Sequence, residues 1–310
     1  MAPDALPPGL YLVATPIGNL DDITLRALDI LKRADRIACE DTRQTQKLLN
    51  HFSITTPTIS CHEHNERERA SELIGTIKAG GRIAVVSDAG MPGISDPGGL
   101  LVKEAIAAGV PVIPIPGANA ALSALIASGL PTSEFHFLGF LPEKTGPRRT
   151  RLEDLAAVPR DSAQTLIFYE APHRILGTLS DLEAVWGPTL HAVVARELTK
   201  LHEEFLRGTV AEIRKELASR DRIRGEFVLL IEAPAKSKSS ASDLGAPGPS
   251  PLGTWEGNPP THESISARIA RLQSESGIDE KEALKRLARE LGQSKSALYR
   301  ELQRERARRK

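Results

Sequence analysis

The stretch that decides the fold is Ser87–Gly99, which reads SDAGMPGISDPGG. It follows Arg82–Val86, a short β-branched apolar run typical of a buried strand, and precedes Leu100–Ala108, whose apolar residues have helical spacing. A long loop rich in Gly and Pro therefore stands where a parallel strand leads into a helix. In open α/β sheets, ligands bind at this place, outside the carboxyl ends of the strands. A purely structural connection is the alternative, but loops of this length are usually functional.

Strands and helices alternate on both sides of this loop. Further strands are expected at Leu10–Ala14, Arg36–Glu40 and Val110–Ile115, and helices at Thr24–Ala34, Thr45–His51, Glu66–Ala79 and Ala120–Ser128. The alternation is typical of a parallel sheet with helical crossovers. A second series of strands, at about 135–141, 165–170, 191–198, 203–207 and 226–231, is less evenly spaced and predicts a mixed sheet. We therefore expect a two-domain α/β protein with a parallel-sheet N-terminal domain and a mixed-sheet C-terminal domain.

Length and composition favour a cytoplasmic globular protein. The chain has 310 residues, enough for two domains of ordinary size, with 40% hydrophobic and 26% charged residues. No run of 18 apolar residues is present, and the first residues lack the features of a signal peptide. The two cysteines, Cys39 and Cys61, give no disulfide framework and suit a reducing compartment.

The chain is expected to have five segments. They are a flexible N-terminus (1–9), an N-terminal α/β domain (10–122), a C-terminal α/β domain (123–234), a disordered linker (235–262) and a basic tail resembling a helix-turn-helix (263–310). In the linker, 14 of the 28 residues are Pro, Gly or Ser, too polar a composition to offset chain entropy.

The tail has helical signals and an excess of positive charge. Leu284, Leu287, Ala288 and Leu291 indicate one helix, and Ser294 is placed to cap a second. From residue 263 to 310 there are 13 Lys and Arg against 8 Asp and Glu, although the whole chain has no net charge. The pattern favours nucleic-acid contact, and a dimerisation hairpin is the alternative.

Three loops meet at the carboxyl ends of the first-domain strands: Pro16–Asn19, Ser87–Gly98 and Pro116–Asn119. None has the glycine spacing of a dinucleotide or triphosphate cradle, and the central loop has no Lys or Arg for a phosphate. Aspartates and many backbone donors suit a ligand with an amino group, a ribose and a small carboxylate. S-adenosylmethionine is one such ligand, and other zwitterionic ligands remain open.

Seven motifs occur in one order: Thr15–Asp22, Glu40–Arg43, Ser87–Gly98, Pro116–Ala120, Phe168–Arg174, Arg196–Lys200 and His202–Thr209. On these motifs the chain resembles the tetrapyrrole-methylase-like (class III) S-adenosylmethionine methyltransferases, and within them the branch that methylates small-subunit ribosomal RNA. The resemblance covers about residues 10–233. It implies that S-adenosylmethionine binds between two α/β domains and that the protein is a homodimer. It also implies 2′-O-methylation of a cytidine ribose in the decoding region of 16S rRNA. The substrate is then either the naked 16S rRNA or the rRNA within the small ribosomal subunit.

The resemblance also suggests site residues. The residues expected to bind the cofactor are Pro16, Asp88, Gly90, Ile94, Ser95, Gly117, Ala118 and Tyr169, whereas Asp96 is expected to brace the loop. Glu170 and Lys200 are the candidates for catalysis near the ribose hydroxyl, although Glu170 and Arg174 can instead form a structural ion pair. The candidates for RNA contact are Arg43, Arg174, Arg196, Arg304 and Arg308. No metal site is expected, because His62, His64 and Cys61 lack a convincing further ligand.

Two other functions remain open. One is a small-molecule methyltransferase acting on a tetrapyrrole, which would need an apolar floor for the macrocycle and has little use for a basic tail. The other is an RNA-binding ribosome assembly factor without catalysis, which cofactor binding would argue against.

Overall fold

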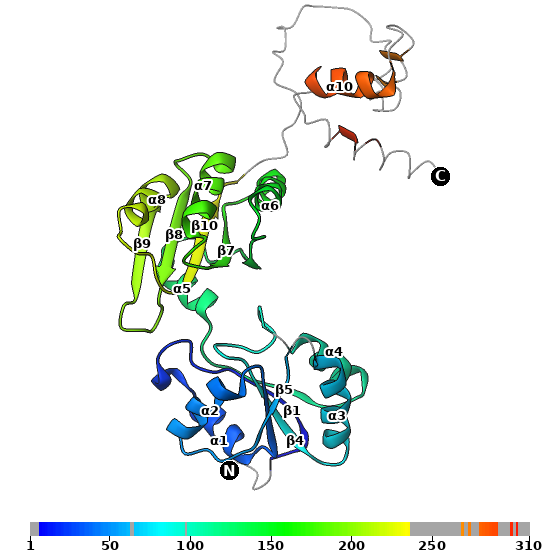
Figure 1. The fold of residues 1–310 in the computed structure, drawn as a ribbon, viewed down its shortest axis with the longest axis vertical. Helices are drawn as coiled ribbons and strands as arrows, with labels where there is room; N and C mark the ends of the chain where they lie inside the picture. Colours follow the sequence, from blue (N-terminus) through cyan, green and yellow to red (C-terminus); the bar gives the residue numbers. More distant parts are fainter. Residues whose placement is uncertain are drawn as a thin grey trace, which may run out of the picture. The chain divides into compact units, whose positions relative to one another are not determined.

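The computed structural model describes residues 6–62, 65–96, 98–235, 268–269, 272–273, 279–290, 298–299 and 302. By its contacts the chain forms two compact units, Met1–Ser242 and Asp243–Lys310. The first unit contains two five-stranded sheets, which we call its first and second halves (Figure 1). No helix in the described part of the chain is long and apolar enough to cross a membrane.

The first half is built on a parallel sheet with the strand order β3-β2-β4-β1-β5. Its strands are β1 (Gly9–Val13), β2 (Arg36–Cys39), β3 (Thr58–Ser60), β4 (Arg82–Val86) and β5 (Val112–Ile115). Its helices are the 3-10 turn η1 (Leu20–Asp22), α1 (Leu25–Arg33), α2 (Thr42–His51), α3 (Glu66–Lys78) and α4 (Gly99–Ala107). The expected parallel sheet with helical crossovers is confirmed.

Residues on β4 alternate between the two faces of this sheet, as the strand period of two requires. Ala84 and Val86 pack with α1 and α2, whereas Ile83 and Val85 pack with α3 and α4. Helices therefore cover both faces, and the ends of the strands are left for a ligand site.

Two details of the first half differ from expectation. Helix α2 begins at Thr42 rather than Thr45, because the Asp41 carboxylate accepts a hydrogen bond from the Arg43 amide and caps the helix. Strand β3 was not expected, since it has only three residues and pairs at the edge of the sheet.

The second half is built on a mixed sheet with the order β6-β7-β10-β8-β9. Its strands are β6 (Phe135–Phe140), β7 (Gln164–Glu170), β8 (His191–Arg196), β9 (Glu204–Thr209) and β10 (Phe227–Ala233). Strands β6 and β7 are parallel, and the other neighbours are antiparallel. The expected mixed sheet is confirmed. Helices α6 (Thr145–Ala157), α7 (Ile175–Trp186) and α8 (Val210–Ala218) share one core with one face of this sheet.

Helix α5 (Ala120–Ser128) covers the other face of the second sheet. Ala121, Ala124 and Leu125 are buried there against residues of β7, β8 and β10. The expected boundary between residues 122 and 123 falls inside this helix. Because α5 packs on the second sheet as one element, its contacts assign it to the second half.

Residues 6–9, which belong to the N-terminal segment expected to be flexible, form hydrogen bonds with the first half. Strand β1 begins at Gly9, the Tyr11 hydroxyl donates to the Pro7 carbonyl oxygen at 2.6 Å, and Arg82 Nε donates to the Leu6 carbonyl oxygen at 2.7 Å. Residues 1–5 lie outside the described residues.

In the second unit the structure describes helix α10 (Glu280–Glu290). Its buried side chains Leu284 and Leu287 pack with Leu298 and Leu302. The rest of the expected tail and the linker after residue 235 lie outside the described residues, so these expectations stay predictions.

Candidate functional site

The central loop after β4 has a backbone that few residues other than glycine can adopt. Gly90, Gly93 and Gly98 have φ angles of 82°, 81° and 119°. Gly90 forms a bridge with Thr15 at the end of β1, with N–O distances of 2.9 and 3.1 Å. The loop is therefore pinned across the carboxyl ends of β4 and β1.

A buried carboxylate fixes the far end of this loop. Glu66 on α3 is 8% exposed, and its Oε1 accepts hydrogen bonds from the amides of Gly98, Leu100 and Leu101 at 3.0 to 3.1 Å. These amides belong to the first turn of α4, where a negative charge is favourable. Both ends of the loop are thus held by the first half.

The second half brings aromatic side chains to the site. The Tyr169 ring, near the end of β7, meets the rings of Phe137 and Phe140 edge-on, with centroids 5.0 and 5.7 Å apart. The Tyr169 hydroxyl also forms a hydrogen bond with the backbone of Ala121 at the start of α5, and burial raises its pKa. The Tyr169 side chain is therefore held in place by its neighbours.

A cavity of about 310 Å³ lies between this loop and these strands, which is within the usual range for a small-ligand site. From the first half it is lined by Gly90, Ile94, Ser95 and Asp96 among others, and from the second half by Phe140, Tyr169 and Val228 among others. Most of its wall is apolar, and Asp96 and Glu170 bring carboxylates to it.

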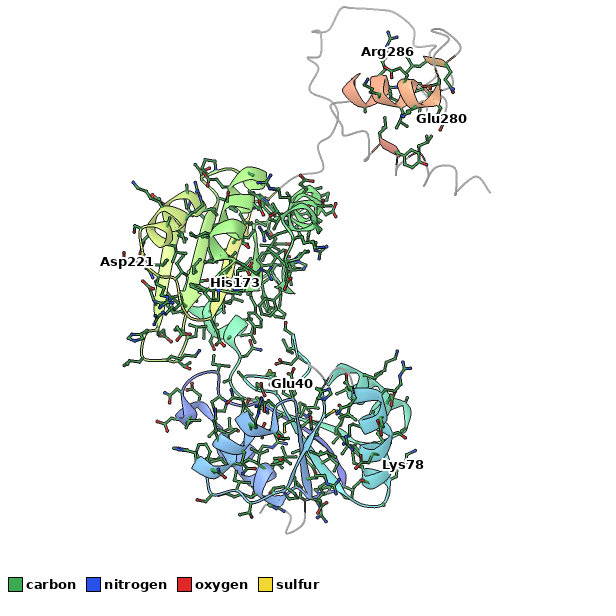
Figure 2. The ribbon with its side chains drawn as sticks, viewed as in Figure 1. Glu40, Lys78, His173, Asp221, Glu280 and Arg286 are labelled. Atoms are coloured by element: carbon green, nitrogen blue, oxygen red, sulfur yellow. The ribbon has the colours of Figure 1, made fainter. Side chains whose placement is uncertain are left out.

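Asp96 lines the cavity, although the sequence suggested that it braces the loop. Burial, together with the negative charges of Glu40 and Asp88, raises the pKa of the Asp96 carboxyl to about 6, against an opposing hydrogen bond from Ser87. Figure 2 labels Glu40, which follows β2 at the carboxyl end of the first sheet. Three acidic groups therefore influence one side of the cavity, a setting that favours a positively charged ligand.

The structure brings some of the residues predicted to bind the cofactor into the cavity wall, but not all. Gly90, Ile94, Ser95 and Tyr169 line it. The cavity-lining residues do not include Pro16, Asp88, Gly117 and Ala118.

Two of these non-lining residues bring neighbouring loops together. The Asp88 carboxylate accepts a hydrogen bond from the Asp41 amide at 3.4 Å. Gly117 packs so closely on Ala14 that an added Cβ would lie 2.8 Å from the Ala14 Cβ. We interpret these contacts as supporting the shape of the cavity.

Glu170 lines the cavity but is fully engaged by neighbouring groups. It is 3% exposed, and its carboxylate accepts hydrogen bonds from the Thr178 hydroxyl at 2.6 Å and the Ala171 amide at 2.9 Å. Arg174 Nε lies 3.0 Å from the same carboxylate. The structural ion pair considered for Glu170 and Arg174 is present.

Lys200 lies in a tight loop between β8 and β9. Its ammonium donates to Glu197 at 3.0 Å and to Glu226 at 2.9 Å. Burial lowers the pKa of Lys200, but the hydrogen bonds to Glu226 and Glu197 outweigh that effect, so the pKa is raised. Lys200 is therefore a charged group at neutral pH and a poor proton acceptor.

The loop between β8 and β9 contacts the first half and has a strained backbone. Glu197 and Thr199 have φ angles of 51° and 65°, in the left-handed region that side chains other than glycine rarely adopt. The Thr199 hydroxyl accepts a hydrogen bond from the Asn19 amide of the first half at 3.1 Å. A Cβ added to Gly18 would lie 3.0 Å from the Leu198 carbonyl oxygen, so the two loops are in close contact.

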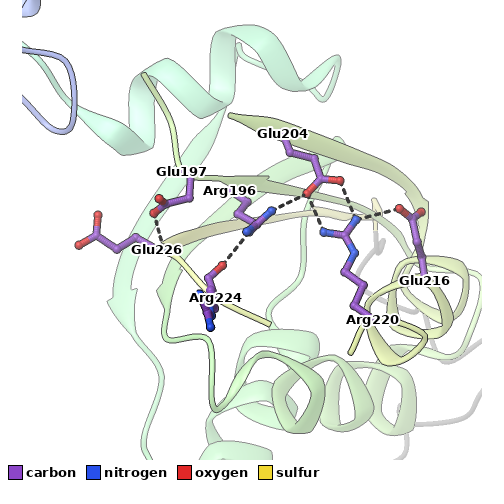
Figure 3. Close-up of polar contacts among 7 residues, drawn as sticks. All are labelled: Arg196, Glu197, Glu204, Glu216, Arg220, Arg224 and Glu226. Carbon is purple, nitrogen blue, oxygen red and sulfur yellow. Dashed lines mark hydrogen bonds and ion pairs between the residues drawn. The ribbon is translucent and has the colours of Figure 1, made fainter. Parts of the chain in front are cut away.

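Arg196, a candidate for RNA contact, belongs to an ion-pair network in the second half (Figure 3). Its Nε donates to the Arg224 carbonyl oxygen at 2.6 Å, and its Nη1 lies 3.2 Å from Glu204. Glu204 also pairs with Arg220 at 2.6 Å, which in turn pairs with Glu216 at 3.0 Å. The contacts favour a structural role for Arg196.

The other arginines predicted to contact RNA have different surroundings. The Arg43 side chain is 87% exposed and pairs with Asp41 at 3.0 Å. Arg174 Nη2 donates to the Leu141 carbonyl oxygen at 2.6 Å. Arg304 and Arg308 lie outside the described residues. Arg43 is thus the described arginine of this set that is most accessible to a phosphate.

The sequence patterns do not reveal the cavity-lining side chains of the second half other than Tyr169 and Glu170. Phe140, Leu198, Phe227 and Val228 line the cavity. In the sequence they look like core residues of strands or strand ends. Gly139 next to Phe140, with a φ of 63°, is the one signal that could have indicated an irregular strand end there.

Comparisons with known proteins agree on one family. Residues 9–214 match the sequence profile of the family described as Tetrapyrrole (Corrin/Porphyrin) Methylases. The chain is 48% identical over 290 residues to the ribosomal RNA small subunit methyltransferase I of Halalkalibacterium halodurans, covering 94% of this chain and 93% of that protein. It is 54% identical over 222 residues to the protein of the same name from Synechocystis sp., covering 72% and 78%.

A solved structure has the same fold. The uroporphyrin-III C-methyltransferase of Thermus thermophilus, complexed with S-adenosylhomocysteine, superposes with a TM-score of 0.50 at 21% identity. The superposition covers 72% of this chain and 96% of that chain. At this identity the likeness concerns the two-domain α/β fold alone.

Proposed function

This chain belongs to the tetrapyrrole methylase family and, within it, to the ribosomal RNA small subunit methyltransferases I, and from that premise we propose that it methylates ribosomal RNA with S-adenosylmethionine. The acceptor we propose is the 2′-hydroxyl of a cytidine in the decoding region of 16S rRNA. The match along 93% of the length of a named relative is the observation that carries the proposal. The site of action is then the cytoplasm, where ribosomal subunits are assembled.

The cavity fits the proposed cofactor in size and in charge. S-adenosylmethionine carries a positive sulfonium, and the carboxylates of Asp96, Glu40 and Asp88 make this side of the cavity favourable to a cation. The Tyr169 ring offers a surface for adenine or for the sulfonium. Gly90 has no side chain to fill the cavity that it lines.

When bound, the cofactor supplies an electrophilic methyl group, and the residues of the chain have to align an acceptor oxygen with it. The contacts of Tyr169 and Phe140 fix one wall, and the bridge between Gly90 and Thr15 fixes the other. The mostly apolar lining disfavours water beside the methyl group.

Glu170 and Lys200 fit positioning roles better than the role of a base. The Glu170 carboxylate holds the Ala171 amide and Arg174, and so fixes the loop that follows β7. Lys200 stays charged between Glu197 and Glu226, of which Glu226 lines the cavity. Both remain proposals as site residues, together with Arg43 and the basic tail for RNA contact.

The first experiment incubates the protein with methyl-labelled S-adenosylmethionine and small ribosomal subunits that lack this methylation. Naked 16S rRNA and uroporphyrinogen are parallel acceptors. We expect label on one cytidine 2′-oxygen, located by RNA fragmentation and mass spectrometry. Label on uroporphyrinogen alone, or cofactor binding with no labelled RNA, would overturn the proposal in favour of a small-molecule enzyme or an assembly factor.

The proposed roles of the tail and of dimerisation have separate tests. Removing residues 235–310 should weaken binding to the small subunit and reduce the dependence of that binding on salt, because basic residues release counterions from RNA. An unchanged salt slope would contradict this role of the tail. Sedimentation equilibrium should give twice the chain mass if the protein is the proposed homodimer.

A further inference from the structure

A groove continues from the cavity along the second half. It lies between residues 140–143, at the end of β6, and residues 171–174, which follow β7, and has a volume of about 590 Å³. Phe140 and Ala171 line both the groove and the cavity, so the two spaces adjoin. His173, which is labelled in Figure 2, lines the groove from the β7 side. An acceptor that enters the cavity on the side of Phe140 and Ala171 lies next to this groove.

The groove is held in shape by two arginines, the half-buried Arg174 and the buried Arg148. Arg174 Nη2 donates to the Leu141 carbonyl oxygen at 2.6 Å and so ties the two sides together. Arg148, which is 5% exposed, donates from Nη1 to the Glu143 carbonyl oxygen at 3.1 Å and pairs with Asp181 at 2.7 Å. The backbone around the groove therefore has little freedom to collapse, which is the condition for a preformed binding site.

Phe140 places an aromatic ring at the junction of groove and cavity. The ring belongs to a residue that is 54% exposed, unusual for phenylalanine in a strand. A shift in strand register between Phe137 and Phe140, with Gly139 at a φ of 63°, turns this residue toward the site. The edge-on contact with Tyr169 keeps the ring in place. An exposed, held ring beside a ligand cavity is a stacking surface.

The polar groups of the groove fit an amine better than a phosphate. Arg174 is already paired with Glu170 at 3.0 Å, so its charge is largely neutralised. The Glu143 side chain is exposed, and no described residue pairs with its carboxylate. A carboxylate accepts well from the exocyclic amine of cytosine, which uracil lacks. Phe140, Leu141 and Pro142 complete a wall for a flat ring.

We propose that this groove binds the unstacked base of the nucleotide to be methylated, with Phe140 as its stacking surface and Glu143 as the acceptor for the cytosine amine. The inference rests on the proposed function and adds to it the site at which the base is recognised. Sequence-specific RNA recognition commonly uses such unstacked bases on aromatic side chains.

The stacking part is tested with Phe140→Leu, with Phe135→Leu as the matched control. Phe135 lies on the same strand, is 42% exposed and does not line the groove or the cavity. Stacking on an aromatic side chain accounts for about 5- to 150-fold in affinity per base. We expect kcat/KM for small subunits to fall at least about tenfold in Phe140→Leu and to stay near wild type in Phe135→Leu. Phe140→Tyr, which keeps the ring, should restore most of the activity.

The amine contact is tested with Glu143→Gln, with Glu153→Gln on the exposed face of α6 as its control. The substrates are subunits with cytidine or uridine at the target position. Wild type and Glu153→Gln should prefer cytidine, and Glu143→Gln should lose most of that preference. Calorimetric titration of each variant with S-adenosylhomocysteine separates effects on RNA from effects on the cofactor.

The outcomes separate this inference from the proposed function. If wild type methylates the RNA while Phe140→Leu equals Phe135→Leu, or loses activity only through weaker cofactor binding, the stacking role is overturned and the proposed function stands. An unchanged base preference in Glu143→Gln overturns the amine contact. If wild type methylates no RNA at all, both the function and this inference fail.

Discussion

In the first half of the compact unit the residues that line the cavity come mostly from one loop with a restricted backbone (the backbone wall), whereas in the second half they come mostly from strands (the side-chain wall). Gly90 and the residues around Ile94 come from the loop after β4, and glycines and the Glu66 carboxylate hold that loop. Tyr169 and Val228 stand on β7 and β10, and their places follow from strand pairing. The first wall depends on local backbone conformation, and the second depends on the register of a whole sheet.

The largest effect is expected from a change to the backbone wall. In Gly90→Val a β-branched side chain must adopt a left-handed conformation, which costs roughly 1–2 kcal/mol, and it also enters the cavity. We expect the affinity for S-adenosylhomocysteine, measured by calorimetry, to fall about 100-fold.

Gly129→Val is the matched control for this change. Gly129 has a φ of 83°, close to the 82° of Gly90, but it ends α5 and is not among the residues lining the cavity. Both variants should lose stability, and only Gly90→Val should lose affinity. Equal losses of affinity in the two variants would mean that the effect of Gly90→Val comes from lost stability and not from the cavity wall.

The side-chain wall should respond to the loss of a ring rather than of a hydroxyl. Tyr169→Leu removes the aromatic surface, and we expect cofactor affinity to fall about tenfold, in line with aromatic and cation–π contributions. Tyr169→Phe keeps the ring and should stay within about threefold. If Tyr169→Phe were as weak as Tyr169→Leu, the hydrogen bond to Ala121 and not the ring would carry the effect.

The acidic side of the cavity should make cofactor affinity depend on pH. Because the pKa of Asp96 is about 6, the group is mostly neutral at pH 5 and mostly a carboxylate at pH 7. Affinity for the cationic S-adenosylmethionine should therefore rise about three- to tenfold over that interval. S-adenosylhomocysteine, which lacks the sulfonium charge, should show a flatter profile, and Asp96→Asn should abolish the difference. A steep profile that persists in Asp96→Asn would show that Asp96 is not the group responsible for the pH dependence.

The smallest effect is expected away from both walls. Arg220→Gln removes the partner of Glu204 in the network of Figure 3, where both side chains are partly exposed. The free energy of unfolding, from urea denaturation, should fall by about 1 kcal/mol. Cofactor affinity should not change, because neither residue lines the cavity. A loss of affinity would show that the side-chain wall depends on β9, the edge strand of its sheet.

The same contrast explains what the sequence could predict. Strand Arg82–Val86 and helix Ala120–Ser128 agree with the structure residue for residue, because periodicity and turn residues determine them locally. Gly90 and Ile94 were identified because their loop resembles a motif of a known family. Phe140 was missed, because its exposure results from a register shift between two strands that the linear sequence does not reveal.

Close packing explains the predicted residues that do not line the cavity. Gly117 belongs to a motif after a strand end, but the contact of its backbone with Ala14 decides its position. Asp88 is adjacent to the cavity-lining Ala89 in the chain, yet its carboxylate is directed to the Asp41 amide. A motif identifies the loop, and only the fold decides which atoms of the loop face the ligand.

The strained loop between β8 and β9 has a consequence for hydrogen exchange. Left-handed conformations at Glu197 and Thr199 each cost roughly 1–2 kcal/mol, and the bonds to Glu226, Lys200 and Asn19 offset that cost. Amide hydrogen bonds in such a loop open through local fluctuations more often than the amide hydrogen bonds of the neighbouring strands. Deuterium uptake at the Asn19 amide, which donates to Thr199, should therefore report in the unmodified protein how often the two halves lose this contact.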